Sequence, residues 1–300
     1  MEKLQKKIGI SMDEIVNTEK LIGGELRKVI YEFKEEKKKT GFPFGTLCII
    51  HYKEYTDSFN EEIYLVAAAI ELLILSSDIL DDLQDKDTDY IWTKAPALSL
   101  NAVLAMLAIA SKVISNSTFK HRSLALKIVN DYILLSINGQ QLDLLNACQD
   151  ESSYLNMIEQ KSGSLTAMSC LVGFGLATGK ISMQVEKYAK AIGVIQQIKN
   201  DFKDVSKWSS KNDLLNRKYS LPIIYLLSQN DENSVKIKKY YNKEAGINIL
   251  DKPTLENVLL SKASIYILAI KNIYKNKSLP IIKSLISSEE SKSYLINLMK

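Results

Sequence analysis

The residues best suited to chemistry are four aspartates that follow an apolar run at positions 63–80. They stand at i, i+3, i+4 and i+7: Asp78, Asp81, Asp82 and Asp85. If the run is a helix, this spacing places all four carboxylates on one stripe, where like charges cost about 0.2–0.5 kcal/mol per pair. A cation removes that cost, and oxygen donors without His or Cys suit Mg²⁺ or Ca²⁺. The stripe therefore predicts a Mg²⁺ site for a phosphorylated ligand; a solvated helix end is the alternative.

A second polar stripe occurs far downstream, on the apolar stretch 192–205. Its members again stand at i, i+3, i+4 and i+7: Gln197, Asn200, Asp201 and Asp204. Two apolar helices that each carry one acidic stripe are poorly explained as solvated faces. We expect them to form two walls of one cavity that binds metal ions.

Lys161 is the third candidate, because small and apolar residues surround it in the sequence. A lysine buried there needs an anionic partner. The alternative is a surface lysine whose stem packs on apolar residues while its amine stays in water.

The composition indicates the elements that must position these groups. The 300 residues include only five Pro and twelve Gly, and no linker or low-complexity tract interrupts them. This favours one all-α domain over residues 1–300, with at least ten helices and no strand. We expect a first helix over 11–39 opened by a capping box at Ser11, a loop at 41–45 and a buried helix over 46–55. A loop at 207–212, with Lys207 and Lys211, could close over the site.

Charge and residue counts exclude several classes of function. The balance of 39 basic against 35 acidic residues is not typical of nucleic-acid binding. Two His and three dispersed Cys disfavour a zinc site or a His-based triad and suit a cytoplasmic protein. The first residues are charged, which does not fit a signal peptide. We expect no membrane span, because Glu71 and Asp78 break the best apolar run.

Taken together and in order, the motifs resemble those of the trans-polyprenyl diphosphate synthases. The resemblance covers most of the chain. It is carried by DDLQD at 81–85, Gly139-Gln140 with Asp143-Leu144, KSGSL at 161–165, QIKNDFKDV at 197–205, and Asp213-Leu214 with Lys218 and Ser220-Leu221-Pro222.

The resemblance implies a class I isoprenoid synthase bundle of helices around a central apolar cavity, and roles for individual residues. It implies catalytic roles for Asp81, Asp82, Asp85 and Lys161. It implies Mg²⁺ ligands at Asp81, Asp85, Asn200, Asp201 and Asp204, although the family usually has Asp at position 200. It implies substrate contacts at Lys161, Gln197, Lys218, Ser76, Ser77 and Gln140. By analogy with the family, we expect a homodimer.

Two departures point to a subgroup of this family. Chain-elongating members carry a basic motif for a second diphosphate, but the chain reads TGFPFG at 40–45. Tyr90 and Ile91 replace the family's Arg pair. Two diphosphates in a partly dry cavity each need cations, so equipment for only one remains.

The segments around 42–55, 67–87 and 95–101 resemble the ComQ-type isoprenyl transferases. These bacterial enzymes modify a tryptophan of the precursor of a quorum-sensing peptide, the ComX pheromone. The resemblance implies a farnesyl or geranyl diphosphate donor, and small Ser76 and Ser77 favour farnesyl. The alternatives are a class I terpene cyclase, a chain-elongating synthase, and a non-catalytic regulatory subunit of a prenyl synthase.

Overall fold

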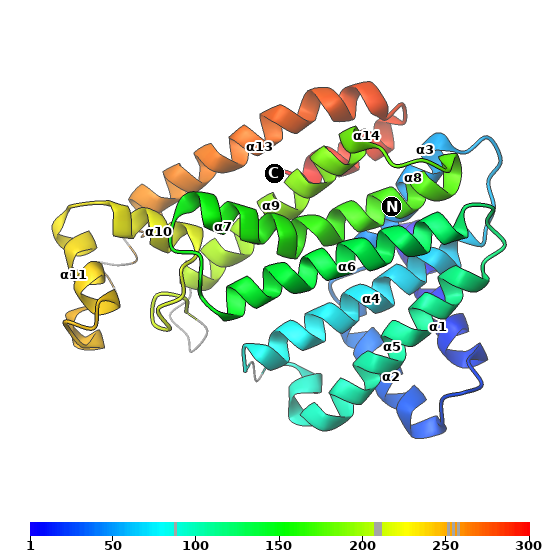
Figure 1. The fold of residues 1–300 in the computed structure, drawn as a ribbon, viewed down its shortest axis with the longest axis horizontal. Coiled ribbons are helices and arrows are strands. Elements are labelled where there is room, and N and C mark those ends of the chain that lie inside the picture. The colour runs from blue at the N-terminus through cyan, green and yellow to red at the C-terminus, as the bar shows by residue number, and fades with distance from the viewer. Residues whose placement is uncertain (87–88, 207–211, 251–252, 254–255, 257–258) are drawn as a thin grey trace. The chain divides into compact units, whose positions relative to one another are not determined.

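The computed structural model describes residues 1–86, 89–206, 212–250, 253, 256 and 259–300 (Figure 1). Those residues contain more than ten helices and no strand, which confirms the predicted all-α class. The chain divides into two compact units, Met1–Leu134 with Leu165–Glu186, and Leu135–Ser164 with Lys187–Lys300. Each unit is described by itself, and the single domain over 1–300 stays a prediction. The predicted loop at 207–212 lies outside the described residues except for Asn212.

The first unit is organised around one apolar helix. Its elements are α1 (Glu2–Thr18), α2 (Gly24–Lys38), α3 (Pro43–Tyr55), α4 (Ile63–Gln84), the 3₁₀ turn η1 (Ile91–Lys94) and α5 (Pro96–Asn116), with parts of α6 (Arg122–Leu144), α8 (Ser164–Thr178) and α9 (Met183–Ser206). Helix α4 packs against α1, α3 and α5, and its residues from Ile63 to Ser76 are buried apart from Leu65 (Figure 1). This burial fixes the direction in which the aspartates at its C-terminal end leave the core.

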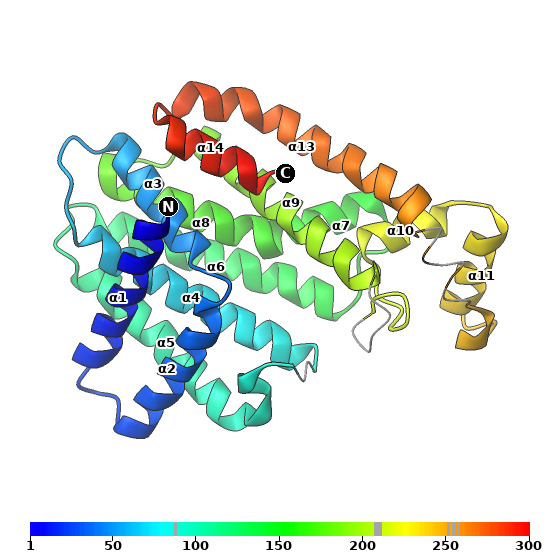
Figure 2. The ribbon, with the colours of Figure 1, turned by 180° about the vertical axis from the view of Figure 1, so that it is seen from behind.

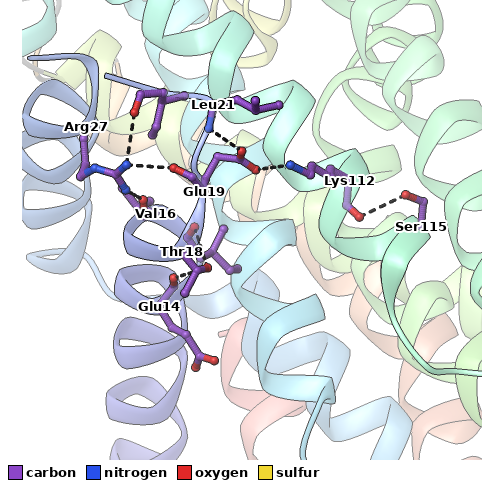
Figure 3. A network of polar contacts seen from close by, with 10 residues as sticks. Glu14, Val16, Thr18, Glu19, Leu21, Arg27, Lys112 and Ser115 are labelled. Carbon is purple, nitrogen blue, oxygen red and sulfur yellow. Dashed lines mark hydrogen bonds and ion pairs between the residues drawn. The ribbon is translucent and has the colours of Figure 1, made fainter. Parts of the chain in front are cut away.

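The chain does not form the single helix predicted over 11–39. It forms α1 and α2, and Ser11 lies buried within α1 instead of opening a helix. Gly23, in extended conformation, is the N-cap of α2. Arg27 then donates hydrogen bonds to carbonyl oxygens at and just beyond the C-terminal end of α1, those of Val16, Glu19 and Ile22 (Figure 3). The prediction was wrong because these orphan carbonyls find their donor on the next helix.

The turn between α1 and α2 is also tied to α5. The carboxylate of Glu19 accepts from Lys112 at 2.7 Å and from the backbone N–H of Leu21 at 3.0 Å (Figure 3). The ion pair with Lys112 lowers the pKa of Glu19. Arg27 and Glu19 therefore have structural roles in this part of the first unit.

Two helices are long and apolar enough to cross a membrane, α4 with 22 residues and α5 with 21. The prediction that no stretch of the chain has this length and composition was therefore wrong. The most apolar window of α4 is 78% buried inside the protein, as expected of a core helix, whereas that of α5 is 39% buried. Length and apolar character are weak signs of a membrane span when the helix is packed in a core.

The second unit holds the remaining elements. They are α7 (Glu151–Ile158), the π-helical turn η2 (Glu159–Gly163), α10 (Leu221–Ser228), α11 (Glu232–Tyr241), η3 (Ile247–Ile249), η4 (Leu259–Ala263), α13 (Ser264–Leu285) and α14 (Glu289–Leu298), with the rest of α6 and α9. One apolar cluster joins α7, α9, α10 and α13 through Tyr154, Ile198, Leu221 and Ile267. Figure 2 shows α14 beside α13, and Lys199 of α9 donates to the carbonyl of Leu298 at 3.2 Å.

Candidate active site

The first aspartate-rich motif lies at the C-terminal end of α4, as predicted. Asp81 and Asp82 are half-buried in its last turn, and Asp85 is the exposed C-cap residue with helical backbone angles. The backbone N–H of Asp85 donates to the carbonyl of Asp81 at 2.9 Å, so the helical spacing of the stripe is kept to its end.

Asp78, the first member of the stripe, has a lysine partner that the sequence did not reveal. Lys37 of α2 is 8% exposed, and its amine lies 2.6 Å from Oδ2 of Asp78. The buried cation neutralises this carboxylate within the protein. The like-charge cost expected for the stripe is therefore partly removed by a lysine.

Asp82 also has a protein partner. The indole N–H of Trp92 donates to Oδ2 of Asp82 at 2.9 Å. Trp92 belongs to η1, the turn that leads from the motif into α5. No spacing rule pointed to this residue, because its role depends on where η1 packs.

Glu71 lies fully buried in α4, two turns before Asp78. Its Oε1 accepts from the backbone N–H of Gly45 at 2.6 Å. Burial raises the pKa of Glu71 from 4.5 to about 7, while the nearby positive charge of Lys37 opposes the shift. The folded protein therefore holds a proton that the unfolded chain would release at a lower pH.

This shift predicts a pH dependence of stability. The folded-state pKa of Glu71 is raised, so the stability it contributes is lost as pH rises from about 4.5 toward 7. We expect Glu71→Gln, which keeps an acceptor for Gly45, to unfold at a higher temperature than the wild type at pH 8 and at about the same temperature at pH 4.5. Thermal unfolding followed by circular dichroism measures both. A Gln variant that is less stable than the wild type at pH 8 contradicts this reading.

Ser76 and Ser77, two of the predicted substrate contacts, form hydrogen bonds within their own helix. Ser76 is fully buried and donates to the carbonyl of Leu72 at 2.8 Å; Ser77 is half-buried and donates to that of Leu73 at 3.1 Å. Both hydroxyls are satisfied by α4, so neither requires a polar ligand. Their contact with substrate stays a prediction.

In the second unit, Lys161 lies on the π-helical turn η2, a type of turn often found at functional sites. Its amine lies 2.7 Å from Oδ2 of Asp143 on α6, and the two side chains are 13% and 25% exposed. A Cβ on Gly139 would lie 2.3 Å from the backbone N of Lys161, so α6 touches η2 directly. The anionic partner that burial demanded is Asp143 in this structure. Gln140, the next residue of α6, is half-buried.

Asp201 of the second motif is held by a chain of hydrogen bonds. Tyr154 of α7 donates to its Oδ2, and the amide of Gln197 donates to its Oδ1 at 2.8 Å. Ser162 of η2 donates in turn to Oε1 of Gln197 at 2.5 Å. The chain links η2, α7 and α9 within the second unit.

A second carboxylate, Asp213, interacts with Asp201. Burial raises the pKa of both groups, and the negative charge of Asp213 raises that of Asp201 further. The positive charge of Lys218 acts on Asp213 in the opposite direction. Asp213 is therefore an additional member of the predicted site. Its motif was recognised in the sequence, but no role was assigned to it.

The oxygen donors suit a hard divalent cation, although no cage of protein ligands is formed. In the part of the chain that the structure describes, no three His, Cys, Asp or Glu side chains lie close enough to hold a metal ion. Asn200 is exposed and Asp204 is half-buried. Mg²⁺ takes one or two carboxylates and completes its shell with water or phosphate oxygens, so these residues fit it. The two motifs belong to different units, and their predicted meeting in one cavity stays a prediction.

The family model described as polyprenyl synthetase matches residues 43–252. The chain belongs to the polyprenyl synthetase family. Among its relatives is the tryptophan prenyltransferase ComQ of Bacillus spizizenii, 37% identical over 236 residues, which are 77% of this chain and 81% of that one. The ComQ of Bacillus subtilis subsp. natto (strain BEST195) is 33% identical over 294 residues, 97% and 90% of the two chains.

Both relatives are named tryptophan prenyltransferases, and this chain is likewise a prenyltransferase. A solved polyprenyl synthetase from Streptomyces coelicolor A3(2) has the same fold, with a TM-score of 0.79 at 17% identity over 100% of this chain and 97% of that one. A polyprenyl synthase from Caulobacter crescentus CB15, solved with calcium and isoprenyl diphosphate, gives 0.74 at 16% identity over 100% and 92%. The predicted class I isoprenoid synthase fold is confirmed.

The fold also shows what replaces the basic motif that chain-elongating members carry. Phe42 is 3% exposed, Pro43 opens α3, and the N–H of Gly45 binds Glu71. Tyr90, at one position of the family's Arg pair, stacks on Trp92. Residues that pack within the first unit therefore occupy the place of the basic motif and one position of the Arg pair.

Proposed function

We propose that this prenyltransferase moves a farnesyl or geranyl group from its diphosphate to a tryptophan of a pheromone precursor peptide of the ComX type. The replacement of the second-diphosphate clamp by packed residues carries the proposal. Phe42 and Gly45 are committed to packing and to Glu71, so the chain has no basic group at these positions to receive a second diphosphate. A peptide acceptor carries no diphosphate, so it does not need such a basic group.

In this proposal, carboxylates and lysines share the work of holding one diphosphate. Asp81 and Asp85 of the first motif, and Asn200, Asp201 and Asp204 of the second motif, would hold Mg²⁺, which would neutralise the charge of the leaving diphosphate. Lys161 and Lys218 add charge-assisted hydrogen bonds, and Lys161 exchanges Asp143 for a phosphate oxygen. The allylic C–O bond breaks, the indole ring of the tryptophan forms the new bond to the allylic carbon, and the proton that the ring gives up passes to the released diphosphate.

Mass spectrometry of the products tests this function directly. Purified protein, Mg²⁺ and farnesyl diphosphate are incubated alone, with isopentenyl diphosphate, or with a Trp-containing precursor peptide from the neighbouring gene. A peptide heavier by one farnesyl unit, lost with EDTA, is the expected result. A longer diphosphate shows chain elongation, a free hydrocarbon or alcohol shows a cyclase, and either contradicts the proposal.

We also propose a cytoplasmic homodimer. Large apolar side chains stand exposed on α5 and on the following helix, among them Leu98, Leu104 and Leu134, at 60%, 66% and 66% exposure. A second copy of the chain is the expected partner that covers these side chains. Light scattering of the purified protein measures the state.

Chain-length preference gives a further prediction. Ser77→Phe adds an aromatic ring to the half-buried position before the first motif, and is expected to shift the preference for geranyl over farnesyl diphosphate by about tenfold. Competition between the two diphosphates, read by mass spectrometry, measures the ratio. Ser115→Phe, at an exposed serine of α5, serves as the matched control. If both variants keep the wild-type ratio, Ser77 does not line the pocket.

A further inference from the structure

Trp92 is fixed in place by contacts from several elements of the first unit. Its ring stacks on Tyr90 with centroids 4.9 Å apart and planes 11° apart, and Phe33 of α2 meets it edge-on at 5.7 Å. Ser99 of α5 donates to its carbonyl oxygen at 2.7 Å. With only 4% of the residue exposed, the indole has little freedom to turn.

The one polar atom of this ring points at the first aspartate-rich motif. Its N–H donates to Oδ2 of Asp82 at 2.9 Å, a normal length for a bond to a carboxylate. In a helix, Asp82 lies about 100° around the axis from Asp81, and Asp85 about 40°. Trp92 therefore holds the carboxylate at one edge of the stripe.

The chemical type of this donor distinguishes it from the partner of Asp78. Lys37 carries a positive charge and neutralises Asp78. An indole N–H carries no net charge, so Trp92 orients the carboxylate of Asp82 without adding a positive charge of its own beside the motif.

We infer that Trp92 is a positioning residue for the first aspartate-rich motif: it orients the carboxylate of Asp82 and so sets the affinity of the motif for a divalent cation. The inference rests on the proposed cation-binding role of Asp81 and Asp85. Trp92 acts through Asp82 and needs no contact with substrate.

Trp92→Phe isolates the donor, because phenylalanine keeps an aromatic ring between Tyr90 and Phe33 but has no N–H. Mn²⁺ serves as the probe, and its binding is followed by calorimetry and by electron paramagnetic resonance with and without farnesyl diphosphate. We expect Mn²⁺ to bind about tenfold more weakly, as when an outer-shell hydrogen bond is removed. Asp82→Asn should weaken binding at least as much, and adding Trp92→Phe to it should have little further effect.

Tyr90→Phe, which removes a hydroxyl from the same aromatic cluster, is the matched control and should leave Mn²⁺ affinity within about twofold of the wild type. Thermal unfolding of all variants separates stability from binding. A Trp92→Phe protein with a lower melting temperature but unchanged Mn²⁺ affinity overturns the inference, as does a wild type that binds no Mn²⁺. If the wild type binds Mn²⁺ and the precursor peptide stays unmodified, the proposed function fails while the Mn²⁺ comparison still decides the role of Trp92.

Discussion

Asp81→Asn is expected to lower prenyl transfer to the peptide by at least about a hundredfold. The half-buried carboxylate stands four residues before Asp85 at the end of α4. Losing it removes one anionic oxygen ligand from the proposed Mg²⁺ site, and a metal ion acting as a Lewis acid supplies several kcal/mol to such a reaction. Each 1.4 kcal/mol corresponds to about tenfold in rate. Initial rates of peptide modification by mass spectrometry, over a range of Mg²⁺ concentrations, measure the loss.

Two other aspartates provide controls for this variant. Asp131→Asn changes an exposed aspartate of α6 that is paired with Lys127, and should keep wild-type activity and stability. Asp78→Asn removes the partner of the buried Lys37, so we expect this variant to have a lower unfolding temperature than the wild type. If Asp81→Asn keeps more than about a tenth of wild-type activity at low Mg²⁺, the first motif does not carry the metal chemistry.

Gly139→Ala is expected to destabilise the second unit at the π-helical turn that carries Lys161. The new methyl group would lie 2.3 Å from the backbone N and 2.8 Å from Cα of Lys161, and backbone atoms cannot move aside as a flexible side chain can. The π-helical turn must shift, at a cost of about 1–3 kcal/mol or more. Because the shift also moves Lys161 away from its present position beside Asp143, we expect activity to fall at least about tenfold. Chemical denaturation and initial rates measure the two effects.

Gly175→Ala is the matched control within another helix. The nearest atom to its new methyl group is the end of the Ile128 side chain at 3.1 Å, which can rotate away. We expect a loss of stability below about 1 kcal/mol and no change in activity. Equal losses of stability in the two alanine variants would show that the close approach of α6 to η2 adds nothing to the cost of Gly139→Ala.

Local spacing was enough to predict where the candidate groups lie along the chain. The stripe at 78–85 ends a helix, and the stripe at 197–204 lies within α9, because a period of 3.6 residues is imposed by the backbone itself. The apolar runs also predicted α3 and α4 to within a few residues, although α3 begins at Pro43, inside the predicted loop at 41–45. Helix ends were less reliable, since the break between α1 and α2 depends on Arg27 from the following helix.

The partners of the charged groups could not be predicted in the same way. Asp78 and Lys37 are 41 residues apart in the sequence, and Asp201 and Tyr154 are 47 apart. Asp143 belongs to a motif that resembles the family, but the sequence did not predict its pairing with Lys161. Each pairing needs two elements to pack in one particular register. No local pattern contains that information.

The sequence by itself determined that this is an all-helical prenyltransferase with two aspartate-rich stripes and no basic clamp for a second diphosphate, because residue type and helical spacing are local properties. Only the tertiary structure decided which carboxylates are neutralised, which are oriented and which are crowded together. Lys37 neutralises Asp78, Trp92 orients Asp82, and burial beside Asp213 raises the pKa of Asp201. The physical reason is that charge and hydrogen-bond energies depend on distances and burial that arise only when distant segments pack together.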